Sequence, residues 1–262
     1  MNFSMYSTKY TFSKSKLVLR KKTLMETLRL LKFRSLSNDV ELGYIQDILK
    51  KNEFWCSKLW NLNDPMEGVF STYRPEKVDE IFSEKNNTVI CSFSGEETLS
   101  CPLMWGYYAN GFKGVAIETE VKLDKNDNII NEDKNIGGKV IKVDYNNINF
   151  TRVNNLTVEK IMTRKLENWS HEDEYRFLKN AEEGLHQIGT VSKVYFGAPY
   201  HNIENKAEIK SASNNLQKYE DLKDELISSC ENYDHSGGTI SFKDCTIDYN
   251  GLIETKQILS LR

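Results

Sequence analysis

The sequence predicts an α+β fold with mixed or split, largely antiparallel sheets and helices inserted between the strands. Three observations predict it. Short strand-like segments dominate the chain, and the predicted helices do not alternate with them in a regular way. Neither a Gly-x-Gly-x-x-Gly turn nor a Gly-Lys-Ser/Thr phosphate loop follows a predicted strand. We therefore do not expect the regular parallel sheet of a doubly wound protein.

The predicted elements follow one another from Leu28 onward. Predicted strands comprise residues 28–33, 53–58, 88–94, 114–119, 139–145, 172–178 and 191–196. Predicted helices comprise residues 40–49, 76–84, 103–110, 158–168 and 214–232, and Asn38 or Asp39 is expected to cap the first of them. A hairpin is expected around Asn250-Gly251, a pair that favours a type I′ turn.

Composition limits the class of protein. The chain has 262 residues, of which 39% are hydrophobic and 28% are charged, and its mean hydropathy is −0.57. This is a soluble composition with enough apolar material for a core. The net charge of −3 excludes a protein that coats nucleic acid, although it allows a local basic patch. No signal-peptide-like run opens the sequence and no apolar run is long enough for a membrane span, so we expect a cytoplasmic protein without a membrane partner.

Cysteine and histidine usage predicts neither a disulfide nor a metal site. The five Cys residues are odd in number and widely spread, and no Cys-x-x-Cys pair is present. The four His residues are isolated from one another as well. We therefore expect no metal cofactor.

Residues 1–26 differ from the rest of the chain. They contain six Lys or Arg residues and one acidic residue. We favour a solvated arm or an accessory edge strand; the alternative is an arm that contacts phosphates. Residues 27–262 are predicted to form a single α+β domain.

Arg34 ends an apolar strand and is the first candidate for chemistry. Its guanidinium could bind a phosphate or a carboxylate, or it could simply cap the end of the strand. In the next strand, Trp55 and Ser57 share one face, and Ser57 is expected to face the same cleft as Arg34. The Asn63-Asp64-Pro65 segment that follows is most simply a turn, in which the Asx side chains bond the backbone.

Glu172, Glu174 and Arg176 form the most informative pattern. On a strand these three side chains project to the same side. Two like charges and a guanidinium on one face are unfavourable unless they are paired or used in function. The alternative is an exposed strand face with a Glu174–Arg176 pair. A further aromatic cluster near residues 103–109 belongs to the core, except that Tyr108 could offer its ring to a planar ligand.

These segments occur in a specific order that resembles a known family. The ordered set is Lys32-Phe33-Arg34-Ser35-Leu36, Trp55-x-Ser57, Asn63-Asp64-Pro65, Cys91-Ser92-Phe93-Ser94, Leu103-Met104-Trp105, Tyr108-Ala109, Gly114 and Trp169-x-x-Glu172-x-Glu174-x-Arg176. It is similar to the bacterial family catalogued as domain of unknown function 2971. The resemblance covers about residues 28–200, so that residues 201–262 would add a C-terminal helix and hairpin. The family implies no settled activity.

The order of strand-Arg, helix, strand-Ser and late Glu-x-Glu also looks like the layout of ADP-ribosyltransferases. That resemblance implies that Arg34 holds the phosphates or ribose of NAD and that Ser57 orients Glu174. Glu174 would stabilise the positive charge that develops on the ribose as nicotinamide leaves, and Glu172 would engage the acceptor. The ADP-ribosyltransferase pattern has Ser-Thr-Ser where this chain has Trp55-Cys56-Ser57, so only its last Ser is present.

The candidate residues and functions can now be stated. Catalytic candidates are Glu174, Glu172 and Arg34, and NAD-binding candidates are Arg34, Ser57, Trp55, Tyr108, Asn63 and Arg176. We expect an NAD-cleaving ADP-ribosyltransferase or NAD glycohydrolase that modifies a protein or nucleic acid, as a toxin or phage-defence effector. The alternative is a non-catalytic sensor that binds a nucleotide or a phage component. A third hypothesis is a metal-dependent nuclease that uses Glu172, Glu174 and Asp64.

Overall fold

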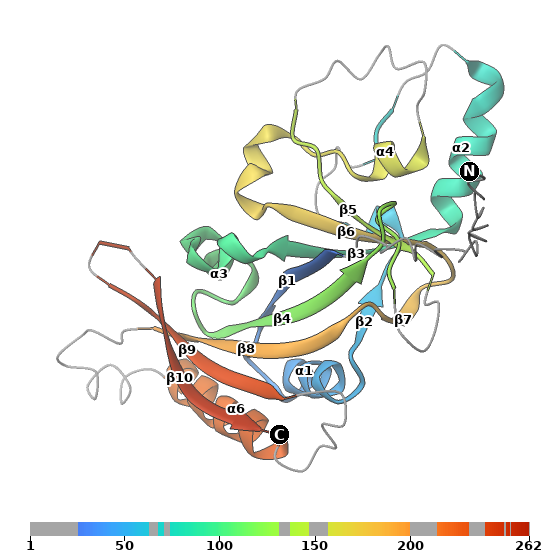
Figure 1. The fold of residues 1–262 in the computed structure, drawn as a ribbon. Coiled ribbons are helices and arrows are strands. Elements are labelled where there is room, and N and C mark those ends of the chain that lie inside the picture. Colours follow the sequence, from blue (N-terminus) through green and yellow to red (C-terminus); the bar gives the residue numbers. More distant parts are fainter. Residues whose placement is uncertain are drawn as a thin grey trace, which may run out of the picture.

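The computed structural model describes residues 26–62, 68–70, 74–130, 137–146, 157–199, 214–230, 239–248, 250–251 and 253–261. Within these ranges a curled sheet of eight strands has the order β10-β9-β8-β4-β1-β3-β6-β5 (Figure 1). Its strands are β1 (Glu26–Ser35), β3 (Thr88–Gly95), β4 (Gly114–Leu123), β5 (Lys139–Lys142), β6 (Glu174–Asn180), β8 (Thr190–Ala198), β9 (Ile240–Ile247) and β10 (Ile253–Leu261). β8 and β9 pair in parallel, and the other neighbours pair antiparallel. β2 (Glu53–Cys56) and β7 (Gly184–Gln187) form a separate two-stranded sheet.

Helices cover both faces of the large sheet. The α-helices are α1 (Asp39–Lys51), α2 (Val78–Asn87), α3 (Pro102–Tyr108), α4 (Val158–Met162) and α6 (Asn214–Cys230). Short 3-10 helices are η1 (Leu59–Asn61), η2 (Pro75–Lys77), η3 (Glu96–Ser100) and η4 (Glu167–Glu172). α1 and α6 pack against the same side of the sheet, whereas α3 lies against β1 from the other side (Figure 1).

The alternation of β1 explains this division. Leu30 belongs to the core beneath α1 and α6, while Leu31 and Phe33 belong to the cluster beneath α3. Phe33 meets the fully buried Trp105 of α3 edge to face, with 5.3 Å between the ring centroids. Because Leu31 and Phe33 are held on the α3 side, the intervening Lys32 and the following Arg34 project to the opposite side of the strand.

The sheet opens between β1 and β3. β1 pairs with β4 along its whole length, from Glu26 opposite Leu123 to Ser35 opposite Gly114. With β3 it pairs at two positions, Leu30 with Gly95 and Leu31 with Ser94. Farther along, Ser57 bridges to β3 at Ile90 in place of β1. The two strands therefore separate beyond Leu31, and the candidate site lies in that separation.

The predicted class is confirmed, since the fold is α+β with a large, mostly antiparallel sheet. An ADP-ribosyltransferase-like core stays a prediction. Asn38 caps α1 as expected, because its side chain accepts from the backbone N–H of Glu41 at 3.0 Å. Residues 1–25 of the predicted basic arm lie outside the described residues.

Several predicted boundaries, and the turn of the predicted hairpin, differ from the structure. The helix expected over residues 158–168 ends at Met162. The strand expected from Glu172 begins at Glu174, because Asp173 adopts a left-handed conformation (φ 39°) and Glu172 closes η4. The C-terminal hairpin is present, but Ile247 pairs with Ile253, so five residues connect its strands instead of a two-residue turn.

Candidate functional site

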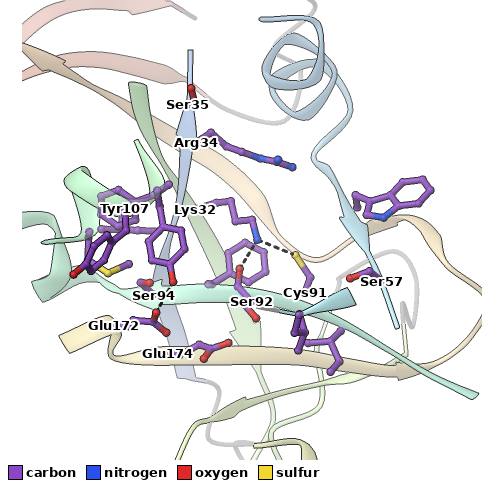
Figure 2. Close-up of a pocket in the computed structure, with 18 of the residues that line it drawn as sticks. Lys32, Arg34, Ser35, Ser57, Cys91, Ser92, Ser94, Tyr107, Glu172 and Glu174 are labelled. Atoms are coloured by element: carbon purple, nitrogen blue, oxygen red, sulfur yellow. Dashed lines mark hydrogen bonds between the residues drawn. The ribbon is translucent and has the colours of Figure 1, made fainter. Parts of the chain in front are cut away.

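A cavity of about 520 Å³ lies where β1 and β3 separate (Figure 2). Side chains from β1, α1, β2, β3, α3, η4 and β6 line it. The cavity thus joins segments that are far apart in the sequence. Figure 2 shows Lys32 and Arg34 leaving β1 in the same direction, with Glu172 and Glu174 on the far side of β3 from them.

Lys32 and Arg34 form the basic side of the cavity. Lys32 Nζ donates to the carbonyl oxygen of Ser92 at 2.7 Å and lies 5.6 Å from the centre of the Phe93 ring. It thereby bonds a β3 carbonyl next to the point where β1 and β3 stop pairing. Arg34 differs, because its Nε is buried and has no hydrogen-bond partner among the described residues. An unpaired buried donor is unfavourable, so an anionic ligand at Arg34 would satisfy a bond that the protein leaves open.

Glu41 lines the cavity together with Arg34, but its carboxylate is bonded to other groups. Glu41 Oε2 accepts from the backbone N–H of Ser37 and from the hydroxyls of Ser35 and Ser37, at 2.7–2.9 Å. Burial opposes ionisation of Glu41, but these hydrogen bonds and the charge of Arg34 lower its pKa. Arg34 and Glu41 therefore attract each other without forming an ion pair.

Glu174 lies on the opposite side of the cavity in a buried ion pair. Arg176 donates from Nε to Glu174 Oε1 at 2.8 Å and from Nη2 to Glu174 Oε2 at 3.0 Å. Lys165 Nζ approaches Glu174 Oε2 at 3.2 Å. Burial alone would raise the pKa of Glu174, but the charge and hydrogen bonds of Arg176, aided by Lys165, lower it to about 2. Glu174 is therefore ionised at neutral pH, with both of its oxygens bonded.

Glu172 is fixed by two donors. The Tyr108 hydroxyl donates to Oε1 at 2.5 Å, and Lys165 Nζ donates to Oε2 at 2.5 Å. The Lys165 ammonium thus lies between the carboxylates of Glu172 and Glu174, where a metal-dependent nuclease would need a divalent cation. In the described ranges, no group of three His, Cys, Asp or Glu side chains is placed to hold a metal.

Aromatic rings stand at the opening of the cavity. Tyr44, Trp55 and Tyr107 line it and are 58%, 55% and 64% exposed, respectively. Trp169 lines it as well, and Lys165 Nζ lies 5.0 Å from the centre of its ring. Exposed rings around a charged cavity are suited to contact the planar part of a ligand.

The cavity brings most of the predicted residues together. It is lined by Arg34, Trp55, Ser57, Tyr108, Glu172 and Glu174. Arg176 does not line it, since its side chain is fully buried and also donates to the carbonyl oxygen of Met162 at 2.6 Å. The alternative of an exposed Glu174–Arg176 pair is wrong, because both residues are buried. Asn63 and Asp64 lie outside the described residues.

Lys32, Cys91 and Lys165 also line the cavity with groups that can carry chemistry, although none of them was a candidate from the sequence. Lys32 could have been found, because strand alternation puts it on the same face as Arg34. Lys165 could not, since residues 158–168 were expected to be helical and the chain leaves the helix at Met162.

Residues 104–177 match the family described as protein of unknown function (DUF2971). The match is to the same family that the motifs predict. The matched DUF2971 segment contributes Tyr108, Glu172 and Glu174 to the cavity, whereas Arg34 and Ser57 precede it. No curated protein and no solved structure matches the chain. Among the helices that are described, none is long and apolar enough to cross a membrane.

Proposed function

We propose that the cavity binds a nucleotide that carries a pyrophosphate, with NAD as the first candidate ligand. The observation that carries the proposal is the buried Nε of Arg34, which has no partner among the described residues in a cavity that Arg34 lines. A guanidinium fork bonds phosphate oxygens through two parallel N–H donors, and these charged bonds are among the strongest in proteins.

The remainder of the cavity supports the same class of ligand. Its volume of about 520 Å³ lies within the range of small-molecule sites. Lys32 adds a second positive charge on the same side of β1 as Arg34. The rings of Trp55 and Tyr44 at the opening offer flat surfaces on which a base could stack. Phosphates at Arg34 and a base at the opening would span the cavity from its basic side to its aromatic side.

NAD cleavage is the second candidate, and one observation favours it. Arg34, Ser57 and Glu174, the three residues that the ADP-ribosyltransferase layout requires, line the same cavity. The ionised carboxylate of Glu174 could stabilise positive charge on the ribose as nicotinamide leaves. A ribose hydroxyl would then have to replace a present partner of Glu174, most readily Lys165, whose contact at 3.2 Å is longer than those of Arg176. Binding is therefore better supported than cleavage.

Calorimetric titration with NAD, ADP and adenosine tests the proposal. We expect NAD and ADP to bind, and adenosine, which has no phosphate, to bind at least tenfold more weakly. If NAD and ADP fail to bind, or bind no better than adenosine, the pyrophosphate proposal is wrong.

A separate assay tests cleavage by measuring nicotinamide release from NAD, with cell extract added as a source of acceptor. Release by the wild-type protein, with loss in a folded Glu174→Gln protein, would support an ADP-ribosyltransferase or NAD glycohydrolase. Binding without release would leave the nucleotide-sensor function, which was the alternative expected from the sequence.

A further inference from the structure

Cys56 and Cys91 lie next to the isolated bridge that joins Ser57 to Ile90, and Cys91 lines the cavity. Ser57 and Ile90 exchange both backbone hydrogen bonds, at 2.9 and 2.8 Å, in an antiparallel bridge. If the register of this isolated bridge is continued by one residue, Cys56 comes opposite Cys91, in a position without backbone hydrogen bonds between the two. Facing residues at such a position have Cα atoms about 4.5 Å apart and side chains on the same face. This separation lies within the range of about 4.4–6.8 Å that a disulfide requires.

The environments of the two thiols are different. Cys91 lines the cavity, and Lys32 Nζ lies 3.9 Å from its Sγ. Cys56 is fully buried behind it, with its Sγ 3.6 Å from the carbonyl oxygen of Phe54. A hydrogen bond from the Cys56 thiol and the charge of Lys32 lower the pKa of Cys91, against the effect of burial, while the same hydrogen bond raises the pKa of Cys56.

The other described cysteines lack this arrangement. Burial raises the pKa of Cys230 and of Cys245 to about 12, which keeps both as unreactive thiols. Cys101 is more exposed than Cys91 and so provides an internal comparison for simple accessibility.

We propose that Cys91 is a peroxide-reactive thiolate and that Cys56 is the thiol that resolves it to a disulfide. The Cys91 thiolate attacks one oxygen of hydrogen peroxide, the O–O bond breaks, and a sulfenic acid and hydroxide result. The Cys56 sulfur then attacks the sulfenic sulfur. The S–O bond breaks, and the leaving hydroxide takes the Cys56 proton to form water. In total, two thiols and one peroxide give one disulfide and two waters.

The disulfide would change the wall of the cavity. It would join the end of β2, next to Trp55 and Ser57, covalently to β3. It would also remove the thiolate that faces Lys32 and so alter the environment of this basic group. The chemistry itself does not depend on nucleotide binding, so the proposal stands or fails separately from the proposed function.

Mass spectrometry of the full-length protein tests the inference. The protein is treated with hydrogen peroxide, its remaining thiols are blocked with N-ethylmaleimide, and it is digested without a reductant. We expect a linked peptide that contains Cys56 and Cys91, and a fall from five titratable thiols to three. The Cys101→Ser protein should form the same link, and the Cys91→Ser protein should not.

A further variant tests the role of the ammonium. The Lys32→Gln protein should form the link several-fold more slowly than the wild-type protein, because its Cys91 thiolate is less stabilised. The inference is overturned if peroxide oxidises Cys101 before Cys91, or if Cys91 is oxidised to sulfinic acid without a link to Cys56. Both results would be read from the wild-type protein, so the test does not depend on the folding of a variant.

Discussion

Glu174 and Arg176 lie two residues apart on β6 and form an ion pair of two hydrogen bonds that is almost closed off from water. The two residues are 4% and 0% exposed, respectively. Their bonds of 2.8 and 3.0 Å use both carboxylate oxygens. A pair at this depth behaves differently from a surface pair, because neither charge can recover hydration if its partner is removed.

Glu174→Gln should destabilise the fold. The change leaves the Arg176 guanidinium buried with a neutral partner, and breaking a buried pair in this way costs about 3–5 kcal/mol. Urea unfolding measures the loss. The matched control is Glu182→Gln at an exposed position, which should change the free energy of unfolding by no more than about 0.5 kcal/mol. A loss below about 1 kcal/mol for Glu174→Gln would show that the pair contributes no more than a surface pair.

Acid should weaken the protein through the same carboxylate. The pKa of Glu174 in the folded state is about 2, below its usual value of 4.5. Its contribution to stability is therefore complete above about pH 4.5 and is lost as the pH falls towards 2. The difference corresponds to roughly 3 kcal/mol. Unfolding measured at a series of pH values should show a steeper decrease between pH 4.5 and 2 for the wild-type protein than for Glu174→Gln. If stability fell equally with pH in the wild-type and Glu174→Gln proteins, the low pKa of Glu174 would be contradicted.

Arg34→Lys should weaken nucleotide binding without destabilising the protein. Lysine keeps the positive charge but cannot reproduce the two-donor fork, and Arg34 Nε has no partner among the described residues to lose. We expect the dissociation constant for ADP to rise roughly tenfold or more. Arg29→Lys is the control on the same strand, because Arg29 is half exposed and pairs with Glu96 and Glu120 at 3.7 Å. If Arg34→Lys and Arg29→Lys changed ADP binding equally, Arg34 would not be a ligand-binding residue.

Trp55→Ala should weaken the binding of ligands that carry a base. Removing a ring on which a base stacks costs about 1–3 kcal/mol of binding free energy. The control is Trp60→Ala, since Trp60 is 63% exposed and does not line the cavity. Inorganic pyrophosphate should bind the Trp55→Ala and wild-type proteins equally, because it has no base. Weaker pyrophosphate binding in the variant would mean that Trp55 supports the basic side of the cavity and does not hold a base.

Local pattern was sufficient to predict much of the fold. The strand that became β1 and the helix that became α1 were both predicted, because apolar spacing and the Asn38 cap act over a few residues. Six of the site candidates from the sequence likewise line the cavity. The separation of β1 from β3 could not be predicted. Where the strands separate, Ser57 pairs with Ile90 of β3. This contact joins residues that are far apart in the sequence, and local sequence patterns do not predict such contacts.

The contacts that Glu172 makes could not be predicted from the sequence pattern. Alternation suggested a strand with Glu172 and Glu174 on one face. The left-handed Asp173 instead turns the chain between them, and Lys165 reaches both carboxylates from a segment that was expected to be helical. Lys165, which contacts both carboxylates, therefore lies outside the Glu-x-Glu-x-Arg pattern that identified Glu172 and Glu174.

The two-position pairing of β1 with β3 also has a mechanical consequence. Leu30 and Leu31 are the positions at which β1, the edge of the half-sheet β10-β9-β8-β4-β1, pairs with β3, the edge of the half-sheet β3-β6-β5. A ligand that bonds both Arg34 on β1 and Ser92 on β3 would connect the two strands where they do not pair with each other. Its binding should slow hydrogen exchange on both edges at once, at amides that the ligand itself does not touch. Ligand binding in the cavity would then make both groups of strands, on either side of the β1–β3 pairing, more rigid.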